Sequence, residues 1–148
     1  MTENIPSIHS PKDRLIISLS LNPFKEFNMK FIQEKYSDIL IEVVNVSSAT
    51  NLYAAEFKEI LFKDIELGCR KIIVDLSNCD FIDSTFLGAL VVSLKKITVC
   101  KGHLVLVGLH ADVNSMFKMT NLFQIFGSFR TKEDAVKSLS PSEIASDT

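Results

Sequence analysis

Three adjacent polar residues, Asp83-Ser84-Thr85, place a carboxylate and two hydroxyl groups just ahead of a long apolar run. A hydroxyl at the start of a helix can carry a phosphoryl group, which backbone N–H groups and the helix dipole would hold. The neighbouring carboxylate of Asp83 would repel that phosphate. In the simpler interpretation, one of the three residues only caps the helix. Local chemistry leaves both interpretations open.

Nucleophilic catalysis by Ser84 would need a nearby base and an oxyanion hole. Ser84 is flanked by Ile82 and Phe86, so the GxSxG elbow of serine hydrolases is absent. His103 and His110 are distant in the sequence and could approach only through the fold. The glycines are scattered and match no phosphate-binding loop. We therefore expect that this protein is not an enzyme.

The three cysteines, Cys69, Cys79 and Cys100, form no CxxC pair, and the three histidines lack ligand spacing. This pattern predicts reduced thiols in a cytoplasmic protein, with no metal and no cofactor. Cys79 lies in the loop before Asp83, so a redox role is a weaker alternative.

The composition is that of a soluble globular domain: 148 residues, of which 47% are hydrophobic and 23% charged. A formal net charge of −2 gives no basic field for a nucleic acid, so direct nucleic acid binding is not expected. The N-terminus has no signal-peptide pattern. Every apolar stretch is broken by charge before 18 residues, so we expect no membrane span.

Alternating buried strands and amphipathic helices must position the three polar residues. The expected strands cover residues 30–34, 39–46, 71–76, 103–107 and 124–129. The expected helices cover residues 52–67, 84–99, 111–119 and 131–139. The order β-β-α-β-α-β-α-β-α predicts an α/β fold with a mixed, mainly parallel sheet of four to five strands and about four helices.

All four prolines lie near the ends of the chain, which suggests one compact domain over residues 28–140. Residues 1–27 form an N-terminal extension, and residues 141–148 form a polar tail. The extension carries an apolar patch, Leu15 to Ile17 with Leu19. It could add an edge strand, dock on the core or serve a partner.

Gly88 lies in the first turns of the expected helix 84–99, where glycine costs about 1 kcal/mol relative to alanine. Either something docks closely on it, or it packs against a strand of the same chain. The sequence does not separate these two explanations.

Residues from about 28 to 140 resemble the STAS domain, and specifically the bacterial anti-sigma factor antagonists. The resemblance rests on the opening strand pair MKFIQEKYSDILIEVVNV, the segment NLYAAEFKEIL and the central segment IIVDLSNCDFIDSTFLGAL. The run GHLVLVGLHADVNSMFKMTNLFQIF and a closing TKEDAVKSL complete it. The family usually shows Asp-Ser-Ser/Thr-Gly-Leu-Gly where this chain has Asp83-Ser84-Thr85-Phe86-Leu87-Gly88.

The resemblance implies a phospho-regulated partner switch with helices packed mostly on one face of the sheet. Its unphosphorylated form would bind an anti-sigma factor that is also a serine kinase, and so release the sigma factor. Phosphorylation of Ser84, with Thr85 as second choice, would end the binding, and a phosphatase would reset it. The partner would contact Asp83, Ser84, Thr85, Phe86 and Gly88. A monomer or weak dimer is expected.

Phe86 departs from the family pattern by replacing the usual first glycine. If exposed, its ring could anchor a partner; if buried, it alters the loop and the choice of kinase. The alternative function is a STAS scaffold or small-ligand sensor that is not phosphorylated, in which Phe86 and the extension form a fixed interface or a ligand pocket.

Overall fold

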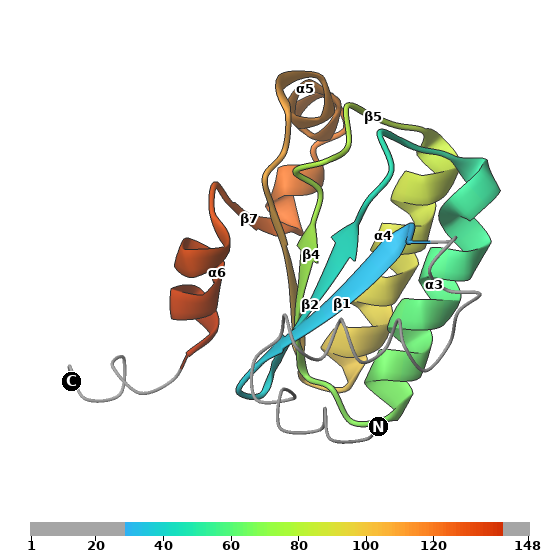
Figure 1. Ribbon diagram of the computed structural model, residues 1–148. Coiled ribbons are helices and arrows are strands. Elements are labelled where there is room, and N and C mark those ends of the chain that lie inside the picture. Colours follow the sequence, from blue (N-terminus) through green and yellow to red (C-terminus); the bar gives the residue numbers. More distant parts are fainter. Residues whose placement is uncertain (1–28, 141–148) are drawn as a thin grey trace, which may run out of the picture.

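A computed structural model describes residues 29–140 of the chain (Figure 1). The extension 1–27 and the tail 141–148 lie outside the described residues, so their expected roles and the domain limits at 28 and 140 stay predictions.

A five-stranded mixed sheet forms the centre of the domain, in the order β1-β2-β4-β6-β7. The antiparallel pair β1–β2 is the hairpin that the sequence predicts, and the remaining neighbours pair in parallel. The predicted α/β class and the mainly parallel sheet are therefore confirmed. The strands are β1 (Phe31–Tyr36), β2 (Ile39–Val44), β4 (Lys71–Asp75), β6 (His103–Val107) and β7 (Gly127–Phe129).

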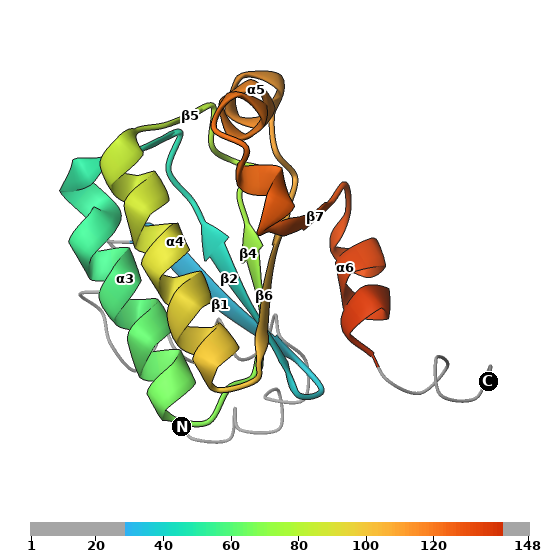
Figure 2. The ribbon, with the colours of Figure 1, turned by 180° about the vertical axis from the view of Figure 1, so that it is seen from behind.

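Within residues 29–140, four α-helices cover the sheet unequally. Helices α3 (Asn51–Glu66) and α4 (Ser84–Val99) lie side by side over one face, and α5 (Ala111–Met119) packs into the same hydrophobic cluster (Figures 1 and 2). Helix α6 (Lys132–Leu139) packs on the opposite face, where Ala135 and Leu139 meet residues of β2, β4 and β6. Most of the helical cover is thus on one face, as predicted.

Two very short strands were missed by the sequence analysis. β3 (Ser48–Ala49) and β5 (Phe81–Ile82) pair in parallel as a separate two-stranded sheet. Two residues are too few to show an alternating pattern, so no periodicity could reveal them. Their pairing fixes the loop before α3 against the loop before α4.

The predicted strand 124–129 is wrong over its first half. Leu122–Gln124 forms the 3₁₀ turn η2, and only Gly127–Phe129 (β7) joins the sheet. Asn121 adopts a left-handed φ of 59°, and the Phe126 N–H donates to the Leu122 carbonyl. This local turn occupies backbone groups that a longer strand would need for its ladder.

Candidate functional site

Helix α4 begins with a side-chain cap made by Asp83. The Asp83 backbone is extended, and its Oδ1 accepts a hydrogen bond from the Phe86 N–H at 2.9 Å. The capping interpretation is therefore correct for Asp83, and it leaves the hydroxyl groups of Ser84 and Thr85 free of the capping role.

The same carboxylate also reaches the neighbouring helix. Asp83 Oδ2 accepts a hydrogen bond from the Asn51 N–H, the first residue of α3, at 2.8 Å. Both helices start at the same edge of the domain, because the short strands β3 and β5 pair immediately before them. One carboxylate thus serves the positive ends of two helix dipoles. The sequence analysis missed this link, since 32 positions separate the two residues.

Ser84 and Thr85 are exposed and are the first two residues of α4. The N–H groups of a first helical turn have no acceptor within the helix, so they can bind an anion. A phosphoryl group on Ser84 would therefore stand in solvent, beside these donors and next to the charge of Asp83.

Phe86 is fully buried, with 0% of its surface exposed. Its ring stacks on Phe57 of α3 with 5.3 Å between centroids, and Phe57 in turn stacks on Phe31 of β1 at 4.9 Å. A ring inside the core offers no surface for the partner contact that the resemblance implies for Phe86, and the structure gives that contact no support. Of the two alternatives, Phe86 is the buried one, and it anchors the first turn of α4 to α3.

Gly88 is exposed, and a Cβ placed on it would meet nothing within 4 Å. Close packing against the chain's own strand is therefore not the reason for this glycine. Gly88 follows Ser84 by four residues, so both lie on one side of α4. Val92, 40% exposed, continues this side by one more turn.

Two exposed apolar side chains belong to the elements next to the start of α4. Leu52, in the first turn of α3, is 79% exposed, and Phe81 of β5 is 49% exposed. Ile82, the other residue of β5, is buried. The start of α4 thus presents hydroxyls and a glycine beside apolar side chains, a composition suited to protein contact.

No described histidine serves Ser84 as a base. His110 Nε2 bonds to the Ser77 carbonyl, and its Nδ1 lies 3.8 Å from Asp80 Oδ1. His103 starts β6, at the opposite end of the strands from the start of α4. The arrangement gives no support to a serine nucleophile.

Cys79 is buried, and burial raises the pKa of its thiol to about 12. A thiol held protonated reacts slowly, so the redox alternative gains no support. Among residues 29–140, no group of three or more His, Cys, Asp or Glu side chains could hold a metal ion. None of the helices in this part of the chain is long and apolar enough to cross a membrane.

The STAS domain model of protein families matches residues 32–135. The chain belongs to the STAS domain family. A relative named as an anti-sigma factor antagonist, BtrV of Bordetella bronchiseptica, is 29% identical over 111 residues, covering 72% of this chain and 91% of BtrV. The STAS recognition and the link to anti-sigma factor antagonists made from the sequence are therefore confirmed.

Solved structures agree on the fold. An anti-sigma factor antagonist of Thermotoga maritima superimposes with a TM-score of 0.69 at 27% identity, over 75% of this chain and 95% of that one. The Bacillus protein SpoIIAA, at 15% identity, has TM-scores of 0.60 unphosphorylated and 0.61 phosphorylated. These matches cover 74% of this chain and 96% and 99% of the two SpoIIAA chains.

Proposed function

We propose that this STAS protein is a phospho-regulated anti-sigma factor antagonist that acts by partner switching. Its unphosphorylated form binds an anti-sigma factor that is also a serine kinase, which releases the sigma factor. Phosphorylation of Ser84 by that kinase ends the binding, and a phosphatase restores it.

The observation that carries this proposal is the division of roles at the start of α4. Asp83 caps the helix, Phe86 anchors it, and Ser84 is left exposed with no structural duty of this kind. The hydroxyl is thus accessible to a kinase, and its modification need not disturb the fold.

The switch follows from local electrostatics. A phosphoryl group adds a charge of about −1.5 to −2 and three acceptor oxygens. A partner that covers Leu52 and Phe81 would have to desolvate this charge next to Asp83, at a cost of several kcal/mol unless it supplies a cation. A coupling of about 3 kcal/mol already changes affinity more than a hundredfold.

A change of fold is not needed for such a switch. The two forms of SpoIIAA match the fold of this chain equally well, with TM-scores of 0.60 and 0.61. This fold is therefore compatible with both the unphosphorylated and the phosphorylated state of such a protein.

The decisive test is intact-mass spectrometry with site mapping on the protein isolated from its native cells with phosphatase inhibitors. One added phosphoryl group on Ser84 is the expected result. A phosphoryl group on Thr85 alone would move the switch by one residue. An unmodified Ser84 peptide under all growth and stress conditions would favour the alternative, a STAS scaffold or small-ligand sensor that is not phosphorylated.

Binding measurements with the kinase test whether a negative charge at position 84 ends the interaction. We expect Ser84→Ala to keep the affinity of the unmodified protein and Ser84→Asp to lose at least a hundredfold. Thr98→Asp is the matched control, because it adds the same charge to an exposed residue near the far end of α4. Equal binding by Ser84→Ala and Ser84→Asp would refute the switch.

A further inference from the structure

The second face of the sheet carries a strip of apolar side chains on β1 and β2. Ile39, Ile41 and Val43 of β2 belong to one hydrophobic cluster with residues of β4, β6 and α6, and Ile32 of β1 packs against it. The three β2 residues are only 1%, 5% and 6% exposed. Water is therefore excluded from this strip.

The described residues supply a cover for only part of this face. Helix α6 has two turns, and its closest packing is on β4, β6 and β7, at the far side of the sheet from β1 (Figure 1). Helices α3, α4 and α5 belong to the other face. Some other part of the protein, beside α6, must therefore exclude water from the strip on β1 and β2.

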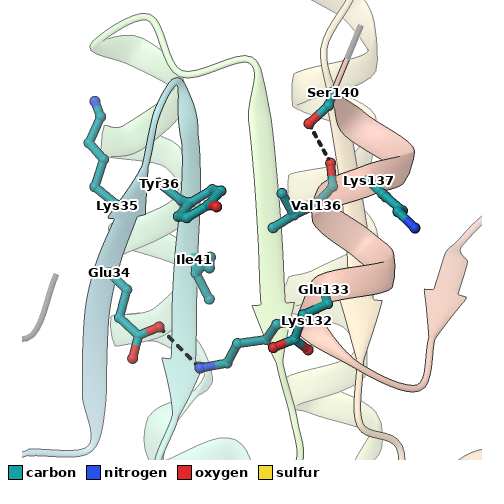
Figure 3. A pocket seen from close by; sticks show the side chains of 9 residues that line it. All are labelled: Glu34, Lys35, Tyr36, Ile41, Lys132, Glu133, Val136, Lys137 and Ser140. Carbon is teal, nitrogen blue, oxygen red and sulfur yellow. Dashed lines mark hydrogen bonds and ion pairs between the residues drawn. The ribbon is translucent and has the colours of Figure 1, made fainter. Parts of the chain in front are cut away.

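A groove lies along the side of α6 that faces the β1–β2 hairpin. It has a volume of about 460 Å³ and runs between the β1–β2 hairpin and α6 (Figure 3). Ile41, Tyr36 and Val136 form the apolar part of its lining, and the remaining lining residues are charged or polar. At one end Lys132 of α6 bridges to Glu34 of β1 at 3.0 Å and to Asp75 of β4 at 3.4 Å, which holds α6 at this distance from β1.

The N-terminal extension contains a segment with matching chemistry. Residues 15–21 read Leu-Ile-Ile-Ser-Leu-Ser-Leu, seven residues without a charge. Leu15, Ile17, Leu19 and Leu21 alternate with the other three, so an extended segment would present four branched aliphatic side chains on one side.

The segment has enough chain to reach the strip. Nine residues lie between Leu21 and Phe31, the first residue of β1, and the ten Cα-to-Cα steps across them can span about 33 Å. A six-residue strand such as β1 is only about 20 Å long. The extension is also additional to the shared fold, because the Thermotoga maritima structure is matched over 95% of its length by 75% of this chain.

We propose that residues 15–21 pack on the second face of the sheet. The side of the segment that carries Leu15, Ile17, Leu19 and Leu21 covers the apolar strip of β1 and β2 beside α6. The folded unit then begins near residue 15 and not at residue 28, and the face opposite to α3 and α4 is closed by the chain itself.

Site-specific cross-linking in the full-length chain tests the contact. A benzophenone amino acid in place of Leu19 should cross-link within one chain to peptides of residues 31–44 or 132–140. Mixing isotope-labelled and unlabelled chains distinguishes a second copy as the partner. Cross-links between chains, cross-links only to α3 or α4, or none at all would overturn the proposal.

Paired charge substitutions provide a second test of this packing. Ile17→Asp with Leu19→Asp should lower the melting temperature by at least about 5 °C and increase binding of an apolar dye. Ser18→Asp with Ser20→Asp adds the same charge on the other side of the segment and should change neither. Equal effects of the two pairs would refute the packing of this side on the sheet.

Discussion

Asp83 at the start of α4 and Asp64 in the last turn of α3 are two carboxylates on the same side of the sheet with opposite surroundings. Both oxygens of Asp83 accept backbone N–H groups, one from each of the two helices. Asp64 is 7% exposed, and its Oδ2 has no hydrogen-bond partner among the described residues. Another acid, Glu42 of β2, interacts with the Asp64 side chain and is 1% exposed.

The difference shows that the available hydrogen-bond donors, more than the depth of burial, decide whether a carboxylate stabilises the fold. Asp83 lies at the positive ends of two helices, where backbone N–H groups donate to both of its oxygens. Glu42 accepts a hydrogen bond from the Gln33 amide at 2.9 Å and shares its site with Asp64. Two acids in one buried site cannot both ionise cheaply, and burial raises the pKa of Asp64.

The largest expected effect on stability comes from removing the Phe86 ring, which anchors the first turn of α4. Phe86→Ala should lower the free energy of unfolding by about 3–5 kcal/mol, because it empties the end of the Phe31–Phe57–Phe86 stack. Urea denaturation followed by circular dichroism measures it. Ser84→Ala, two residues away and exposed, should stay within about 0.5 kcal/mol of the parent. A loss below about 1 kcal/mol for Phe86→Ala would show that the ring is not a core residue.

Removing the Asp83 carboxylate tests its double role directly. Asp83→Ala should cost about 2 kcal/mol, since the Phe86 and Asn51 N–H groups both lose their acceptor. Asp83→Asn should cost about half as much, because its amide keeps one oxygen. The same denaturation assay applies, with hydrogen exchange at the start of α3 as a second measurement. Unchanged exchange at Asn51 in Asp83→Ala would contradict the link between the helices.

The opposite result is expected at the buried acid. Asp64→Asn should raise the free energy of unfolding at pH 7 by about 1 kcal/mol, since an amide can donate to Glu42 and carries no charge. The raised pKa means that the folded state holds this proton more tightly than the unfolded state. Its contribution is therefore complete below the usual value of 3.8 and is lost as pH rises through the folded pKa.

Urea denaturation between pH 4 and pH 8 measures this slope. Asp64→Asn should flatten the decline in stability with rising pH. Glu59→Gln, which removes one charge from an exposed site on the same helix, should leave it unchanged. Parallel curves for the parent and Asp64→Asn would mean that Asp64 does not titrate with a raised pKa.

The smallest effect separates stability from binding at the start of α4. Gly88→Ala should raise the free energy of unfolding by about 0.5–1 kcal/mol, because the new methyl group meets open space. If the partner docks there, the same methyl group should weaken kinase binding. Ala55→Gly, exposed on α3, should lower stability by a similar amount and leave binding unchanged. A Gly88→Ala protein that is more stable and binds equally well would remove Gly88 from the partner surface.

Local pattern in the sequence determined the elements and the position of the candidate site. The helix 84–99 and the strand 103–107 agree with α4 and β6 residue for residue, because their caps and apolar periodicity are short-range features. The same holds for the exposed hydroxyls: a serine directly after an N-cap is held at the helix start by its neighbours alone.

Only the tertiary structure decided which side chains meet. The orientation of Phe86, the bond from Asp83 to Asn51 and the pair of Glu42 with Asp64 each join residues from different elements. One signal was available, since Asp64 follows Phe57 and Leu61 at helical spacing and so shares their buried side. Its acidic partner was not readable, because the pairing depends on how α3 crosses β2, and crossover geometry is set by packing and not by local propensity.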